Sequence, residues 1–225
     1  MTRLCCTRSR VGTLLSIAAI GTISLAAALR QPAAEGMAEA AEALVATLDD
    51  SQREQVLLPY DGEARLGWHF SPKKERKGLA LRDMNDAQQA ATLRLVRAAL
   101  SEAGYDKTTR IMMLEGVLRE LEGSGGTWNR DPEGYYVTVF GKPALADAPW
   151  GLSFEGHHLS LNFVCRGNQI VDSTPQFFGA NPATIRSDVE GALGKGARTL
   201  ADEQDLAFKL LGQLSDAQQG KAVIA

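Results

Sequence analysis

The sequence contains few of the residues that most often carry chemistry. It has three cysteines and three histidines in 225 residues. Cys5 and Cys6 precede an apolar N-terminal run, and Cys165 is the only thiol after it. One thiol cannot form an intramolecular disulfide, so a disulfide-stapled scaffold is excluded for that part of the chain. Because no second thiol accompanies Cys165, we expect a buried or edge thiol rather than a nucleophile.

The sequence also lacks a basic stripe with interleaved aromatic residues. This absence argues against a nucleic-acid partner. The formal charge is -3, and loss of residues 1–29, which contain three arginines and no acid, changes it to -6. With 44% hydrophobic and 23% charged residues, the composition is typical of one globular domain with its own core.

The N-terminal residues 1–30 are predicted to be an export signal. Three of the first ten residues are arginines, and an uncharged apolar run that ends in small residues follows from Val11 to Leu29. The run is also about long enough to span a bilayer, so an uncleaved anchor is the alternative. We therefore expect an exported protein, periplasmic or extracellular, that meets a membrane only through this segment.

Residues 35–225 are predicted to form one α+β domain. Apolar residues at helical spacing predict helices over residues 36–48, 85–103, 107–122 and 197–214. Runs of period 2, or rich in β-branched and aromatic residues, predict strands over residues 66–70, 135–140, 151–155, 157–165 and 169–174. This order indicates N-terminal helices, a central antiparallel sheet of three to five strands and a C-terminal helix.

Helix boundaries are indicated by capping residues. Three capping boxes, beginning at Ser51, Asn85 and Ser215, place an acceptor side chain three residues before a Glu or Gln. Gly104 is expected to end the helix that begins at Asn85, as an αL cap. The box at Ser215 begins a helix that nothing completes, so we expect the domain to be C-terminally incomplete.

Two of the three histidines are adjacent, at positions 157 and 158, shortly after Glu155. Apolar and polar residues alternate from there to residue 163, which is the pattern of a half-buried strand. If His157 opens this strand, it lies on the apolar face with Glu155, and His158 lies on the polar face. Adjacent histidines on opposite faces cannot bind one ion without a bulge.

Imidazole and carboxylate groups are common ligands of Zn, Fe, Cu and Mn. We therefore consider His157, His158, His69 and Glu155 as candidate metal ligands, with His158 and Glu155 as candidate catalytic groups and a divalent transition metal as the candidate cofactor. The spacing matches no dedicated motif such as His-Glu-x-x-His. The alternative is that the histidines are core or loop side chains.

Two further segments carry charged residues. The stretch that begins Arg130-Asp131-Pro132 either presents Arg130 and Tyr136 to a ligand or is ordinary turn chemistry before a strand. A solvated loop is expected to contain the basic residues Lys73, Lys74, Arg76 and Lys77.

A resemblance to a known family rests on nine segments in a fixed order. They are Leu58-Pro59-Tyr60-Asp61, Trp68-His69-Phe70, Gly78-Leu79-Ala80-Leu81, Ile111-Met112-Met113-Leu114-Glu115, Arg130 to Tyr136, Phe140-Gly141-Lys142-Pro143, Pro149-Trp150-Gly151, Phe154 to Asn162 and Thr174 to Pro182. Over about residues 40–225 the chain resembles domain-of-unknown-function family number 3500, which groups uncharacterised bacterial and fungal proteins. The resemblance implies no activity. Members usually continue into a segment with an Asn-His-x-His context and an Arg-Asp pair, which this chain lacks.

Two functions are compatible with these patterns. The first is an exported metal-dependent enzyme, or a remnant of one, that performs a hydrolytic or oxidative reaction on a small organic substrate through the His/Glu site. The second is a non-catalytic exported module that binds a small molecule in a groove of aromatic residues. The proposed groove residues are Trp68, Trp150, Tyr135, Tyr136 and Phe177. A third reading is that the chain is too incomplete for either function.

Overall fold

A mixed β-sheet of seven strands runs through the described part of the chain. The computed structural model describes residues 33–123, 126–144, 146–189 and 193–224, so the predicted export signal lies outside the described residues. The strands are β1 Leu57–Leu58, β2 Leu79–Ala80, β3 Tyr136–Phe140, β4 Trp150–Gly156, β5 Leu159–Arg166, β6 Gln169–Asp172 and β7 Phe177–Phe178. Their order is β1-β3-β4-β5-β6, with β2 also paired to β3 and β7 to β5. The parallel pairing of β1 with β3 makes the sheet mixed.

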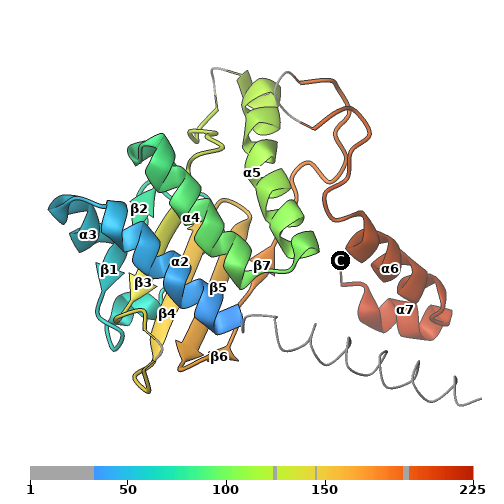
Figure 1. Ribbon diagram of the computed structural model, residues 1–225. Helices are drawn as coiled ribbons and strands as arrows, with labels where there is room; N and C mark the ends of the chain where they lie inside the picture. Colours follow the sequence, from blue (N-terminus) through green and yellow to red (C-terminus); the bar gives the residue numbers. More distant parts are fainter. Residues whose placement is uncertain (1–32, 124–125, 145, 190–192, 225) are drawn as a thin grey trace, which may run out of the picture. The chain divides into compact units, whose positions relative to one another are not determined.

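The helices are α2 Ala33–Thr47, α3 Asp50–Val56, α4 Asp86–Ala99, α5 Glu102–Glu122, α6 Ala201–Gly212 and α7 Asp216–Ala222. Short 3-10 turns occupy η1 Glu63–Arg65 and η2 Leu81–Asp83. Helices α2 and α4 lie side by side across the sheet (Figure 1). No helix in the described ranges has the length and hydropathy needed to cross a membrane. Helices before and after a central sheet confirm the predicted α+β class.

The two faces of the sheet differ in polarity because side chains alternate along each strand. Val137, Phe154 and Leu161 are paired across β3, β4 and β5, are buried, and belong to one core cluster with residues of α2 and α4. On the opposite face, Glu155 of β4 lies directly across from Ser160 of β5. The same alternation therefore builds the apolar core on one face and a polar, largely buried layer on the other.

The predicted strand over residues 157–165 begins too early. Gly156 pairs with Leu159, so His157 and His158 form the two-residue turn of the β4–β5 hairpin. Because the chain reverses at this turn, Glu155 of β4 pairs with Ser160 of β5 and shares its polar face. The prediction that Glu155 lies on the apolar face is therefore wrong.

Three other local predictions are also wrong. Gly104 does not end a helix, because it lies in the first turn of α5, where its N–H donates to Ser101 Oγ. The first capping box begins at Asp49 rather than Ser51. Residues 66–70 form no strand and run as a loop. The boxes at Asn85 and Ser215 are confirmed.

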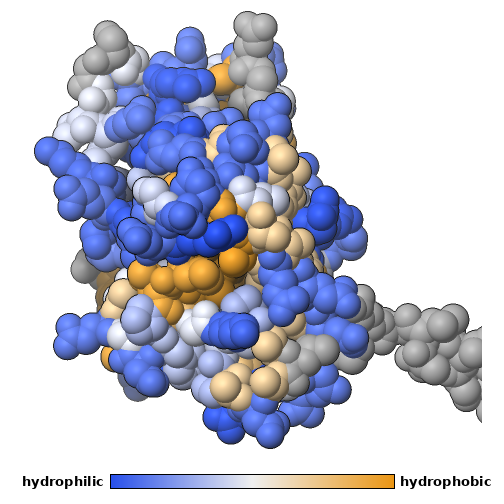
Figure 2. Space-filling model, turned by 60° about the vertical axis from the view of Figure 1, so that its left-hand side comes forward, coloured by the Kyte–Doolittle hydropathy of each residue, from blue (hydrophilic) through white to orange (hydrophobic). Residues whose placement is uncertain are grey.

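Polar residues cover most of the visible surface on one side of the molecule. Figure 2 shows this hydrophilic surface with a band of apolar residues set between its polar parts. Most of the large apolar side chains are in the core, although several on α6, among them Leu206, Phe208 and Leu210, are exposed.

Candidate functional site

The hairpin turn between β4 and β5 presents both adjacent histidines. His158 has φ of 60°, the left-handed region that histidine adopts more readily than most side chains with a Cβ. The centroids of the His157 and His158 rings are 4.0 Å apart. The turn thus brings together two side chains that a continuous strand would hold on opposite faces.

Three segments hold the backbone of this turn in place. The buried Tyr135 hydroxyl donates to the carbonyl oxygen of His157 at 2.9 Å. The N–H of His158 donates to the carbonyl of Phe70, and the N–H of Gly179 donates to the carbonyl of His158, both at 2.8 Å. These bonds satisfy the polar groups of the turn and fix its position.

The His157 ring is bound by a carboxylate from α5. Its Nδ1 lies 2.5 Å from Oε1 of Glu115, and the two side chains are only 12% and 6% exposed. Because a carboxylate only accepts hydrogen bonds, Nδ1 carries the proton in the neutral ring and Nε2 carries the lone pair. Nε2 makes no hydrogen bond within the described part of the chain and is not among its fully buried unpartnered atoms. This is the tautomer that a histidine general base needs.

Arg130 lies against this pair. Its guanidinium binds Glu122 through two hydrogen bonds of 2.7 and 2.9 Å, and its NH1 is 3.8 Å from Glu115 Oε2. The hydrogen bond from Arg130 lowers the pKa of Glu122. NH1 also lies 3.2 Å from Nδ1 of His157. Nδ1 and NH1 are both donors when Nδ1 is protonated, so they form no hydrogen bond with each other. The Nδ1–H group donates to Glu115, and Arg130 is a nearby positive charge.

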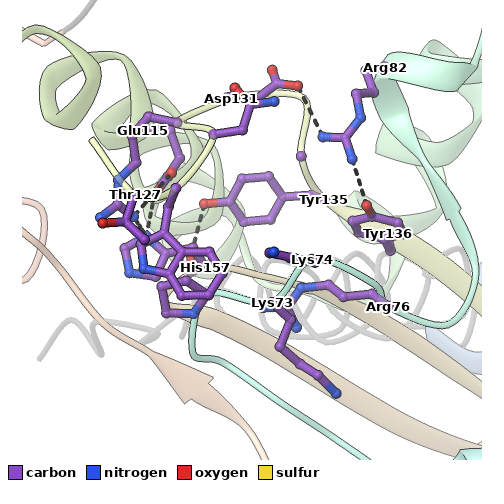
Figure 3. Close-up of a pocket in the computed structure, with 15 residues that line it drawn as sticks. Lys73, Lys74, Arg76, Arg82, Glu115, Thr127, Asp131, Tyr135, Tyr136 and His157 are labelled. Atoms are coloured by element: carbon purple, nitrogen blue, oxygen red, sulfur yellow. Dashed lines mark hydrogen bonds and ion pairs between the residues drawn. The ribbon is translucent and has the colours of Figure 1, made fainter. Parts of the chain in front are cut away.

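The His157–Glu115 pair forms part of the wall of a cavity of about 350 Å³. The cavity is lined by Pro72, Lys73, Lys74, Arg76, Arg82, Glu115, Thr127, Trp128, Asn129, Arg130, Asp131, Gly134, Tyr135, Tyr136 and His157. Figure 3 shows His157 and Glu115 on one side and Arg82, bound to Asp131 and Tyr136, on the other. A cavity of this size suits a small organic molecule.

The segment before β3 contains a turn and also contributes to the cavity. The N–H of Gly134 donates to the carbonyl of Asp131, and the N–H of Glu133 donates to its carboxylate, both at 2.9 Å. Arg130 and Tyr136, on either side of this turn, both line the cavity. The turn is therefore confirmed, and presentation of Arg130 and Tyr136 to a ligand stays a prediction.

The structure does not bring Glu155 to the histidines. Its buried carboxylate binds Lys77 Nζ at 2.7 Å and Arg76 NH1 at 3.4 Å. Arg76 also donates to the carbonyls of His69 and Ser71. Glu155 therefore anchors the loop of residues 67–77 to the polar face of the sheet.

The other two predicted metal ligands are His69, which has a hydrogen-bond partner nearby in sequence, and His158. His69 Nδ1 accepts a hydrogen bond from the N–H of Ser71 at 3.3 Å. His158 Nδ1 is buried without a hydrogen-bond partner among the described residues. Burial, followed by the charges of His157 and Arg130, lowers the pKa of His158 to about 4. Within the described ranges, no three His, Cys, Asp or Glu side chains are grouped to hold a metal ion.

The five aromatic residues predicted to line one groove do not lie together in one groove. Trp150 and Tyr135 are fully buried in the core. Phe177 stacks on Phe70 with 4.0 Å between ring centroids, and Trp68 stacks on the same ring at 5.9 Å. Of the five predicted groove residues, Tyr135 and Tyr136 line the cavity that contains His157.

Sequence reasoning missed Glu115, yet a signal for it exists. Glu115 is 4% exposed and occupies the apolar stripe of α5 that includes Ile111, Leu114 and Leu118. A carboxylate at such a position needs a buried partner, because isolated buried charges are costly. The identity of that partner, His157, depends on how α5 packs against the β4–β5 hairpin.

The comparisons with known proteins identify the family. A family model described as Protein of unknown function (DUF3500) matches residues 30–225, and the chain belongs to this family. No curated protein and no solved structure matches the chain. The match confirms the resemblance seen in the sequence, and it assigns no reaction.

Proposed function

We propose that this member of the DUF3500 family is a hydrolase that acts on a small organic molecule, with His157 as general base and Glu115 as its orienting carboxylate. The observation that supports the proposal is the 2.5 Å contact between His157 Nδ1 and Glu115 Oε1 in the wall of a cavity. Pairs of this kind orient a catalytic imidazole and stabilise its protonated form.

The proposed reaction follows from the tautomer. Nε2 of His157 takes a proton from a water molecule, whose oxygen attacks the electrophilic carbon of an ester or amide in the cavity. The imidazolium then gives this proton to the leaving group, while Glu115 stabilises the transient positive charge. Arg130, held by Glu122, places a positive charge 3.8 Å from Glu115 Oε2 on the side away from the imidazole contact.

Metal-dependent chemistry is the second candidate, and the contact between the His157 and His158 rings favours it. In this case His157 and His158 would hold a divalent transition metal at the turn, and the metal would supply a Lewis-acid or redox centre for a hydrolytic or oxidative reaction. It has less support than the first candidate, because Glu155 binds Arg76 and Lys77 rather than facing the histidines. A non-catalytic binding module that uses the same cavity is the remaining alternative.

The test is a hydrolysis screen with a panel of small carboxylic esters and amides before and after chelator treatment. For any hydrolysed substrate, His157→Gln should lower kcat at least about 100-fold and Glu115→Gln about tenfold. Glu120→Gln is the matched control, because it removes the same charge from an exposed position of the same helix outside the cavity. Activity that disappears with chelator and returns with metal supports the metal-dependent reading. A folded parent that hydrolyses no member of the panel contradicts the hydrolase proposal.

We also propose that the protein is exported through residues 1–30. The support is the order of basic, apolar and small residues in this segment. Mass spectrometry of the protein from the periplasmic or extracellular fraction of a bacterial host should show a chain shortened by about this segment. Retention of the full chain in the cytoplasm contradicts export, and a full-length chain in the membrane fraction identifies an anchor.

A further inference from the structure

Positive charge is concentrated around the cavity of an otherwise acidic protein. The chain has a formal charge of -3, yet five cationic side chains and two carboxylates line this cavity. The cationic residues are Lys73, Lys74, Arg76, Arg82 and Arg130, and the acidic ones are Glu115 and Asp131. The cavity lining is therefore net positive although the protein is net negative, and this charge favours a negatively charged ligand.

The three arginines have partners within the protein. Arg76 binds Glu155, Arg82 binds Asp131 at 3.1 Å, and Arg130 binds Glu122. These bonds hold their guanidinium groups and offset most of their charge. The arginines therefore shape the cavity wall more than they attract a ligand.

Lys73 and Lys74 differ from the arginines. Both are exposed, and neither forms an ion pair with any described residue. They belong to the loop that Glu155 anchors through Arg76 and Lys77, so their backbone is fixed although their side chains are free. Both ammonium groups are therefore available to an oxyanion that enters the cavity.

We infer that the ligand of this cavity carries an oxyanionic group, a carboxylate or a phosphate, which Lys73 and Lys74 bind while Trp128 contacts its organic part. Trp128 lines the same cavity and is 36% exposed, so its ring is accessible to a ligand. The inference rests on the proposed function in that it assigns the substrate class of the same site. It concerns binding, however, and is tested without turnover.

The experiment is calorimetric titration of the purified protein with benzoate, phenyl phosphate and neutral benzamide, at low and high salt. Benzoate and phenyl phosphate share the ring and differ in the oxyanion, so the tighter of the two identifies which oxyanion the site prefers. The test variant is Lys73→Gln/Lys74→Gln. The matched control is Lys142→Gln/Lys209→Gln, which removes the same charge from exposed lysines outside the cavity.

At least one anion should bind the parent, and the Lys73→Gln/Lys74→Gln variant should bind it at least about tenfold more weakly, because it lacks the charge-assisted hydrogen bonds of the two ammonium groups. The control should match the parent, and high salt should weaken binding. The inference is overturned if benzamide binds as tightly as the anions, if neither anion binds the folded parent, or if both double variants behave alike. Titration of His157→Gln separates the two proposals. Anion binding that persists in this variant supports the inference even if no hydrolysis is found, and hydrolysis without anion preference supports only the proposed function.

Discussion

Tyr135 donates its buried hydroxyl to the main-chain carbonyl oxygen of His157, 2.9 Å away. The Tyr135 ring also stacks on Phe154, with 6.0 Å between centroids, inside the main core cluster. Burial raises the pKa of Tyr135 well above its ordinary value, so the phenol stays neutral and remains a donor. One side chain thus ties the position of the proposed general base to the packing of the core.

Tyr135→Phe should lower the free energy of unfolding by about 1–3 kcal/mol, because it leaves the carbonyl of His157 without its donor. The measurement is urea denaturation, in which the midpoint should fall at constant m. Tyr136→Phe is the control, since the Tyr136 hydroxyl accepts a hydrogen bond from the partly exposed Arg82. Equal losses in the two variants contradict a special role for the bond to His157.

Glu155→Gln should lower the free energy of unfolding by about 3–5 kcal/mol, because it leaves the buried charges of Arg76 and Lys77 uncompensated. Asp131→Asn removes a carboxylate from the more exposed Arg82 pair and should cost less than about 1 kcal/mol. Chemical denaturation of both variants makes the comparison. If Glu155 instead acts as a ligand or catalytic group, its variant should lose activity with little change in stability.

The pH dependence of stability should report on His158. Its pKa is lowered to about 4 in the folded protein and is about 6.5 when unfolded. Between these values the unfolded chain binds more protons, so the stabilisation present above pH 6.5 declines as the pH falls toward 4. The slope should stay below about 1.4 kcal/mol per pH unit, because one imidazole exchanges at most one proton.

His158→Asn is the matching variant for this measurement, since asparagine tolerates the positive φ of the turn. The difference in unfolding free energy between the parent and this variant isolates the contribution of His158 from that of the carboxylates. A difference that does not change between pH 7 and pH 4 would show that His158 does not titrate as described. The neighbouring charges that bear on it are those of His157 and Arg130.

Two glycine substitutions should have opposite effects. A Cβ on Gly156 would lie 2.3 Å from the Tyr135 ring, so Gly156→Ala should destabilise the protein by at least about 2 kcal/mol. A Cβ on Gly36 in α2 meets nothing within 4 Å, so Gly36→Ala should stabilise it by about 0.5–1 kcal/mol. Thermal unfolding of the two variants beside the parent tests both signs. A neutral Gly156→Ala would mean that the hairpin yields easily and does not hold His157 rigidly.

Much of the fold could be predicted from local patterns. The apolar spacing of α2, α4 and α5 and the alternation in β3, β4 and β5 indicate these elements because burial of one face selects the period of the chain. The capping boxes at Asn85 and Ser215 are also local, since both partners lie within four residues. Predictions failed where two local readings compete. Gly104 is compatible with a helix end, but Ser101 is the N-cap of the next helix, α5, so Gly104 lies inside that helix.

The sequence by itself determined the α+β class and the family, predicted a buried Cys165, and identified the segment with adjacent histidines as the candidate site. Burial raises the pKa of Cys165 to about 11, in keeping with the predicted buried thiol. Only the tertiary structure decided which carboxylate meets His157. Glu155 is two residues away in sequence, but the turn places it on the other face, where Arg76 and Lys77 bind it. Glu115 is 42 residues away and reaches the ring through the packing of α5 on the hairpin. Sequence separation sets which residues share a strand or a helix face, whereas contacts between elements depend on how their buried faces pack, and no local pattern encodes that packing.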